Sequence, residues 1–223
     1  GSVAGDGRVS AFGRTVVAEV FPIGIDTAGF RRSATTKEAS GHAERMGRVL
    51  QNRLAVVGVD RLDYTKGLPE RFLAFERYLR DHPDSLGRVS YVQIAPPSRV
   101  EVESYVQIRE DLERISGRIN GAYSEFDWTA LRYINRAYSR RALAGIYGLA
   151  RVGLVTPLRD GMNLVAWEYV AAQPEDDPGV LVLSRFAGAA QNADGALIVN
   201  PYDIQGVANA LNEALVMPRA ERV

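Results

Sequence analysis

Short apolar runs alternate with amphipathic segments along most of the chain, and this alternation restricts the possible folds more than any other feature. The apolar runs, typical of strands covered on both faces, lie at residues 54–60, 89–97, 131–135, 152–157, 179–184 and 196–200. Segments with apolar residues at helical spacing lie at residues 35–50, 69–83, 101–119, 139–150, 158–173 and 203–215. Strands separated by helices of this length require βαβ crossovers. The sequence therefore predicts an α/β fold of the Rossmann type, with a doubly wound, mostly parallel sheet and helices on both faces.

One domain accommodates these elements. We expect residues 14–223 to form it, beginning with a strand and a turn at residues 14–26. Residues 1–13 are small and polar and contain no apolar segment, so they are expected to be disordered or a linker, without a signal peptide.

Composition narrows the class of partner. Lys plus Arg and Asp plus Glu are both 27, so no net field favours nucleic acid or an anionic membrane. No apolar run approaches the roughly 20 residues that a membrane span needs. The absence of cysteine fits a reducing compartment, and we expect a cytoplasmic globular protein.

In a doubly wound sheet, ligands bind at the carboxyl ends of the strands, beside the switch in strand order. Two cations, Arg61 and Lys66, follow the strand at residues 54–60, and Gly67 then precedes a helix. Two positive charges and a helix N-terminus suit an anion such as a diphosphate. The alternative is a pair of solvated cations, with Asp60 and Asp63 as their salt-bridge partners.

The segment LRDGMNLVAWEYVAAQ follows another strand and places an aspartate, Asp160, before an apolar helix that contains Glu168. Backbone N–H groups of Gly161, Met162 and Asn163 at the helix start are expected to bind phosphate oxygens. The carboxylates would accept hydrogen bonds from sugar hydroxyls. The alternative, an Asp160 helix cap and an exposed Glu168, does not explain a glutamate within such an apolar segment.

Other positions give weaker signals. Arg99 follows a proline pair and could anchor a phosphate, or Ser98 could cap the next helix with Arg99 exposed. Tyr138 could stack on a base, but an aromatic residue at a strand end more often packs in the core or at its rim. The two histidines have no second ligand at metal spacing, so no metal site is expected. A GxGxxG motif is missing, which argues against a dinucleotide oxidoreductase.

Several long segments together resemble the motifs of the trehalose-6-phosphate synthase family. They are GVDRLDYTKGLPERFLAFERYL, VQIAPPSR, GRINGAYSE, VGLVTPLRDGMNLVAWEYVAAQ, GVLVLSRFAGAA and ALIVNPYD. Members of that family are retaining glycosyltransferases with two Rossmann-like domains. The resemblance runs from about Arg14 to the C-terminus and covers only the second, nucleotide-sugar domain, which implies one half of a two-domain fold.

The resemblance implies a role for each candidate residue. Arg61 and Lys66 would bind the diphosphate of UDP-glucose, and Asp160 would contact the glucose hydroxyls, so these three are the expected catalytic residues. Four other contacts are implied: the backbone of Gly161, Met162, Asn163, Leu164 and Val165 around the phosphates and sugar, Glu168 on the ribose, Tyr138 against uracil through its backbone, and Arg99 on the phosphate of glucose 6-phosphate. The glucosyl group would pass to glucose 6-phosphate with retention and without a metal or cofactor.

Two positions depart from the family pattern. Trp167 stands where lysine is usual, and Asn192 stands where glutamate is usual. Together with the missing acceptor domain, they lead us to expect a truncated or engineered chain that binds UDP or UDP-glucose weakly and turns over little or nothing. An exposed interdomain face would also favour a homo-oligomer. The alternatives are a pseudo-glycosyltransferase that couples cyclitol-type donors and a non-catalytic nucleotide-binding or scaffold module.

Overall fold

The computed structural model describes residues 2–3, 7–17, 19–51, 53–97 and 103–223. Its centre is a parallel six-stranded sheet with the strand order β6-β5-β4-β7-β8-β9. The strands are β4 (Leu54–Val59), β5 (Val89–Ile94), β6 (Leu131–Ile134), β7 (Val152–Val155), β8 (Val180–Ser184) and β9 (Leu197–Val199). The chain moves outward from β4 through β5 to β6 and then crosses back to β7, so the switch in strand order lies between β4 and β7. The prediction of a doubly wound α/β sheet is confirmed.

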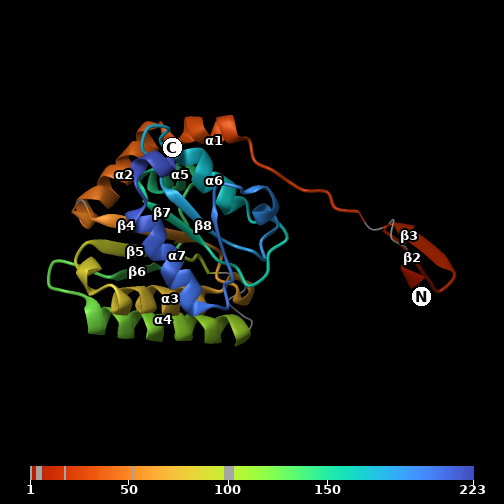
Figure 1. The fold of residues 1–223 in the computed structure, drawn as a ribbon, viewed down its shortest axis with the longest axis horizontal. Helices are drawn as coiled ribbons and strands as arrows, with labels where there is room; N and C mark the ends of the chain where they lie inside the picture. Colours follow the sequence, from red (N-terminus) through yellow and green to blue (C-terminus); the bar gives the residue numbers. More distant parts are fainter. Residues whose placement is uncertain (1, 4–6, 18, 52, 98–102) are drawn as a thin grey trace.

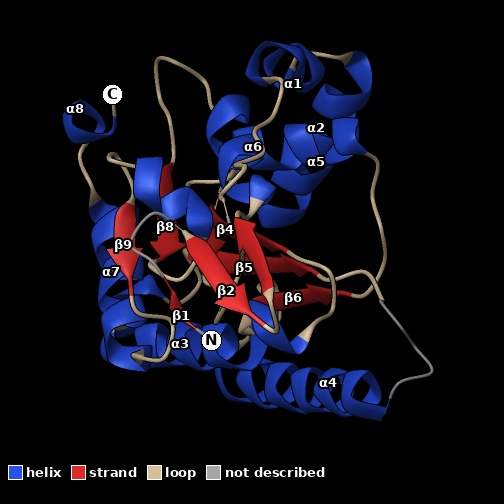
Figure 2. Ribbon diagram, turned by 90° about the vertical axis from the view of Figure 1, so that its right-hand side faces the viewer, coloured by secondary structure: helices blue, strands red, loops and turns tan. Residues whose placement is uncertain are grey.

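Helices cover both faces of this sheet (Figures 1 and 2). One layer contains α3 (Leu68–Asp81), α4 (Glu103–Tyr123) and α7 (Ile204–Val216). The other contains α1 (Thr27–Ala34), α2 (Lys37–Leu50), α5 (Arg140–Leu149) and α6 (Leu164–Ala172). A last short helix, α8, spans Arg219–Arg222. Helix α1 was not predicted, because six of its eight residues are small or charged and only Phe30 is buried.

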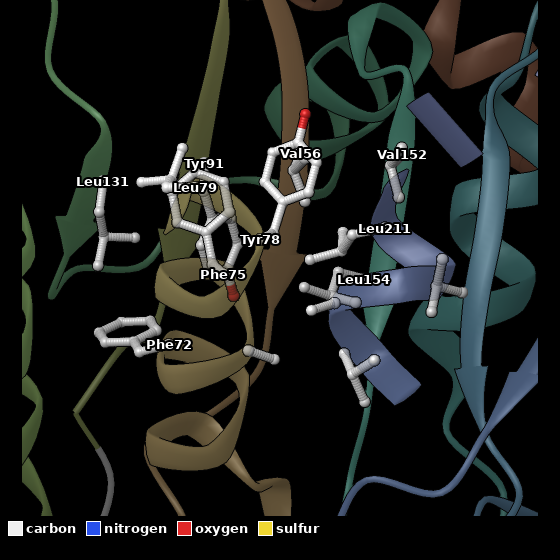
Figure 3. Packing of buried hydrophobic residues seen from close by; sticks show 14 of the residues in the cluster. Val56, Phe72, Phe75, Tyr78, Leu79, Tyr91, Leu131, Val152, Leu154 and Leu211 are labelled. Atoms are coloured by element: carbon white, nitrogen blue, oxygen red, sulfur yellow. The ribbon is translucent and has the colours of Figure 1, made fainter. Parts of the chain in front are cut away.

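Each layer of helices packs against the sheet through its own apolar core. Under α3 and α7, Phe72 and Phe75 meet Tyr91 of β5, and Leu211 faces the central strands (Figure 3). The rings of Phe72 and Tyr91 lie edge to face with their centroids 5.8 Å apart. Because helices cover both faces of the sheet, the side chains on both faces of these strands are buried. This explains why the strand sequences are apolar without interruption.

The N-terminal residues form a β-hairpin. Strands β2 (Arg8–Ala11) and β3 (Arg14–Val17) pair antiparallel around Phe12 and Gly13, and β2 also pairs with β1 (Ser2–Val3). Both turn residues have positive φ, 55° and 71°, as two-residue hairpin turns require. The hairpin spans residue 13, where we expected a disordered or linker segment to end and the domain to begin.

This hairpin and the extended segment after it, the N-terminal arm (residues 7–17 and 19–25), project from the α/β body (Figure 1). Apolar side chains on the arm are exposed, namely Phe12, Val16, Val17, Val20, Phe21 and Ile23. No helix within the described part of the chain is long and apolar enough to cross a membrane.

Candidate functional site

A cavity of about 410 Å³ opens where the chain leaves β4 and β7, on the two sides of the switch in strand order. Its lining residues come from the β4–α3 loop, the β7–α6 loop and the start of α6: Val59, Asp60, Arg61, Lys66, Asp160, Met162, Asn163, Leu164, Val165 and Glu168. We call it the switch cavity. The structure thus brings together eight of the eleven residues that the sequence singled out.

Lys66 is held at the end of a short 3₁₀ turn, η1 (Tyr64–Lys66). Asp63 caps this turn by accepting a hydrogen bond from the amide of Thr65 at 2.9 Å. Burial raises the pKa of Asp63, but the hydrogen bonds from Thr65 and Tyr105 and the charge of Lys66 together hold the pKa below its ordinary value. The next residue, Gly67, has φ of 64°, and a Cβ there would lie 2.7 Å from the carbonyl oxygen of Thr156. Glycine is therefore required to start α3 so close to the β7 loop.

Lys66 forms an ion pair with Asp160, 94 positions away in the sequence. The Lys66 Nζ lies 2.6 Å from Oδ2 of Asp160, and each side chain is only 16% exposed. The alternative interpretation, in which Asp60 or Asp63 pairs with Lys66, is therefore wrong for this cation. Arg61 is exposed at the rim of the cavity, and no ion pair is found for it within the described residues. Its guanidinium is available to an anionic ligand.

The Asp160 carboxylate is fixed by donors other than Lys66. Its Oδ2 accepts a hydrogen bond from Nδ2 of Asn163 at 3.1 Å, and its Oδ1 accepts one from the amide of Met162 at 3.3 Å. The backbone of Asp160 also bridges to the β8 loop, donating to Phe186 and accepting from Gly188. The carboxylate is thus positioned before any ligand arrives.

The first turn of α6 differs from the prediction. The helix begins at Leu164, and Asn163, not Asp160, is its N-cap, with Oδ1 accepting from the amide of Ala166 at 3.3 Å. Asn163 adopts a left-handed conformation with φ of 73°, which asparagine tolerates better than most residues. The Met162 amide is already bonded to Asp160. Within the described residues no acceptor is found for the amides of Gly161, Asn163, Leu164 and Val165, and the last two belong to the first turn of α6.

Glu168 lies on the second turn of α6 and contributes a half-buried carboxylate to the cavity. Burial raises its pKa, and the charge of Arg140 acts in the opposite direction with a smaller effect. No hydrogen bond to this carboxylate is found within the described chain, so it can accept one from a ligand hydroxyl. The alternative of a fully exposed Glu168 is wrong.

Three predicted residues lie elsewhere. Gly161 is exposed beside the cavity and does not line it. Tyr138 lines a separate cavity, where its ring contacts His42 edge to face. Arg99 falls outside the described residues, so its predicted contact with a phosphate stays a prediction.

The two departures from the family pattern share another cavity, of about 360 Å³. Trp167 and Asn192 both line it, together with residues of the α6–β8 loop such as Pro174. Neither residue lines the switch cavity.

Sequence reasoning missed the buried network beneath the cavity. Arg71 of α3 is 1% exposed and forms an ion pair with Asp60 at 2.5 Å. It also donates to the Thr156 hydroxyl at 3.0 Å, to the Gln93 side chain at 3.0 Å and to the carbonyl of Lys66 at 3.2 Å. One guanidinium thus ties together the ends of β4, β5 and β7 and the turn that carries Lys66. The sequence did contain a sign of this network. Arg71 lies on the same helical face as Leu68, Phe72 and Phe75, which places a charged residue among buried apolar ones.

Comparisons with known proteins identify the family of the chain. The model of "Glycosyltransferase family 20" matches residues 2–223. Trehalose-6-phosphate synthase of Sinorhizobium fredii is 53% identical over all of this chain and 48% of its own length. The corresponding enzyme of Klebsiella pneumoniae is 52% identical over 98% of this chain and 46% of its own length. The chain therefore spans about half the length of the curated relatives it matches.

Solved structures give the same result. The UDP-forming α,α-trehalose-phosphate synthase of Burkholderia xenovorans, in complex with glucose-6-phosphate, superposes with a TM-score of 0.93 at 53% identity, over 96% of this chain and 48% of that one. The Escherichia coli protein bound with UDP-2-fluoro glucose superposes with a TM-score of 0.92 at 48% identity, over 99% of this chain and 49% of that one. The chain therefore belongs to glycosyltransferase family 20.

Proposed function

We propose that this chain is the donor-binding half of an α,α-trehalose-phosphate synthase, which transfers glucose from UDP-glucose to glucose 6-phosphate with retention. The observation that carries the proposal is the convergence of Arg61, Lys66 and the free first-turn amides of α6 in one cavity at the switch in strand order. The solved relatives described as complexes with UDP-2-fluoro glucose and with glucose-6-phosphate support this choice of substrates.

Each group in the switch cavity has a task in this proposal. When UDP leaves, negative charge develops on the diphosphate, and Arg61, Lys66 and the amides of Leu164 and Val165 neutralise it. Lys66 exchanges its ion pair with Asp160 for one with the phosphate. Asp160, still held by Asn163 and the Met162 amide, then accepts hydrogen bonds from glucose hydroxyls.

Further contacts complete the proposed site. Glu168 binds the ribose, and the backbone near Tyr138 packs on the uracil. Arg99 reaches the phosphate of glucose 6-phosphate. Because acceptor and donor must be held together for transfer, this chain by itself is expected to bind UDP-glucose but to turn over little of it.

Calorimetry with UDP and UDP-glucose tests the proposal. Lys66→Ala and Arg61→Ala are each expected to weaken binding about tenfold or more, because each removes a charge-assisted contact to the diphosphate. Arg114→Ala, which removes an exposed cation on α4, is the matched control and should leave the affinity unchanged. No heat from folded protein at millimolar UDP-glucose would contradict the proposal. A preference for GDP- or ADP-sugars over UDP-sugars would instead favour a relative that uses a different donor.

A further inference from the structure

A second cavity, of about 210 Å³, lies between α2 and the face of the sheet formed by β5 and β6. We call it the β6 cavity. Its floor is apolar and is formed mainly by Leu50, Val92, Ile94, Ile134 and Ile146. None of its lining residues lines the switch cavity, so the two are separate sites.

The rim of the β6 cavity carries three arginines and a histidine. His42 and Arg45 reach it from α2, Arg132 from β6, and Arg136 from the loop after β6, and no described carboxylate lines it. Eleven other arginines of the described chain form an ion pair with a nearby carboxylate. None of the three rim arginines has such a partner within the described residues. The mutual repulsion of these cations is therefore uncompensated.

Arg132 is the least satisfied of them. Its side chain is half-buried, and its Nε atom is shielded from solvent without a hydrogen-bond partner. Burial lowers the pKa of Arg132, and the nearby charge of Arg53 lowers it further. A shielded guanidinium N–H without an acceptor is costly, because it has lost its water and gained nothing in exchange. An anion in the cavity would supply the missing acceptor.

The remaining rim contacts shape the opening. The guanidinium of Arg136 stacks 5.0 Å from the centre of the Tyr138 ring, and the His42 ring also contacts this tyrosine, edge to face. Tyr138 therefore holds Arg136 over the apolar floor with its hydrogen-bond donors unoccupied within the described structure. A protein cavity of about 150 Å³ accommodates benzene, so the β6 cavity has room for a ring with a small charged group.

We propose that the β6 cavity binds a small organic anion, whose apolar body lies on the floor and whose phosphate or carboxylate group is bound by Arg132 and Arg136. The alternative interpretation, that these arginines are ordinary solvated surface cations, explains only the presence of the charges. It does not explain an apolar floor beneath the charges or a buried, unbonded Nε. The β6 cavity shares no lining residue with the switch cavity, and Tyr138, whose backbone belongs to the proposed uracil contact, lies at its rim.

Phenyl phosphate is the probe, titrated calorimetrically into this chain. We expect saturable binding that weakens about tenfold or more in Arg132→Met and in Arg136→Gln. Arg48→Gln is the matched control, because Arg48 is an exposed α2 cation outside the cavity and should not change the affinity. Phenol and inorganic phosphate, which each supply half of the recognised chemistry, should bind at least about tenfold more weakly than phenyl phosphate.

Phosphate groups could also enter the switch cavity, so two variants separate the sites. Lys66→Ala should retain phenyl phosphate affinity, and Arg132→Met should retain UDP affinity. If Lys66→Ala abolishes phenyl phosphate binding while Arg132→Met does not, the anion sits in the switch cavity and the proposal is overturned. Absence of saturable binding at millimolar phenyl phosphate also overturns it. Arg136 is exposed, so Arg136→Gln keeps the test valid if Arg132→Met fails to fold.

Discussion

At the scale of single residues, the buried pair of Asp60 and Arg71 determines the shape of the switch cavity. Asp60 lines the cavity, yet its carboxylate is bound from below by Arg71 and its side chain is only 2% exposed. Gly58 completes this arrangement, since a Cβ there would lie 2.3 Å from Oε1 of Gln93 and 2.8 Å from Nη1 of Arg71. The network makes the ends of β4, β5 and β7 a single rigid support for Lys66.

Removal of the guanidinium tests this role. Arg71→Met is expected to lower the free energy of unfolding by about 3–5 kcal/mol, because it leaves the Asp60 carboxylate buried without a partner. Adding Asp60→Asn should recover part of the loss, since the uncompensated charge is then gone. Urea denaturation of the two single variants and the double variant measures the coupling. Additive effects would mean that the two groups do not act as a pair.

Glu168 provides a test in which stability and binding change in opposite directions. Its pKa is raised in the folded state by burial, so the ionised form is disfavoured there. The folded state gains from this group below the pKa of the unfolded chain and loses that gain as pH rises through the folded pKa. Glu168→Gln should therefore be more stable than the unchanged chain at neutral pH, by about 0.5 kcal/mol or less because the group is half-exposed.

The advantage of Glu168→Gln should vanish near pH 4, where the glutamate is largely protonated, as thermal denaturation across pH would show. The same variant should bind UDP-glucose more weakly, because an amide is a poorer acceptor for ribose hydroxyls than a carboxylate. A variant that gains affinity would contradict the proposed ribose contact.

At the scale of elements, the contact between α2 and α5 depends on one glycine. A Cβ on Gly145 of α5 would lie 2.1 Å from the carbonyl oxygen of Ala39 in α2. These helices form the wall behind β4 and β7, and α2 also forms one side of the β6 cavity.

Gly145→Ala is expected to destabilise the fold by about 1–3 kcal/mol, since the clash is with backbone and cannot be relieved by a rotamer change. Gly47→Ala in α2 is the matched control, because the nearest atom to its Cβ is 4.0 Å away. There the helix propensity of alanine should stabilise the fold by roughly 0.5–1 kcal/mol. Thermal or urea unfolding of both variants measures the contrast, and equal effects would show that the helix contact is not tight.

At the scale of the whole molecule, the N-terminal arm projects from the α/β body and leaves its apolar side chains exposed (Figure 1). The sheet of β1, β2 and β3 is small, and on the segment that follows it Val20 and Phe21 are 89% and 83% exposed. Exposed apolar surface of this kind favours association. We expect this chain to self-associate through the arm as concentration increases.

Replacing Val20 and Phe21 by serine should shift the chain toward monomer without changing UDP affinity, as sedimentation equilibrium and calorimetry would show. Glu19→Ser, a polar neighbour on the same segment, is the control and should leave self-association unchanged. A chain that is already monomeric at high concentration before substitution would contradict this expectation.

The sequence alone determined the architecture. The spacing of apolar residues and the positions of turn-forming glycine, proline and polar residues are local properties that can be read from the sequence. Continuous apolar runs predicted all six strands of the large sheet, and helical spacing predicted the long helices that cover it but not α1. The rule that ligands bind at the carboxyl ends of parallel strands then selected Arg61, Lys66, Asp160 and Glu168.

Only the tertiary structure decided which of these side chains meet. Lys66 pairs with Asp160 because β4 and β7 are neighbours in the sheet, and strand order is not encoded in any local pattern. Asn163 takes the cap because the loop from β8 fixes the Asp160 backbone. The unpaired arginines of the β6 cavity come from three elements whose spacing in sequence gives no sign of their proximity. Periodicity specifies the environment of a residue, whereas its partner depends on contacts between distant segments.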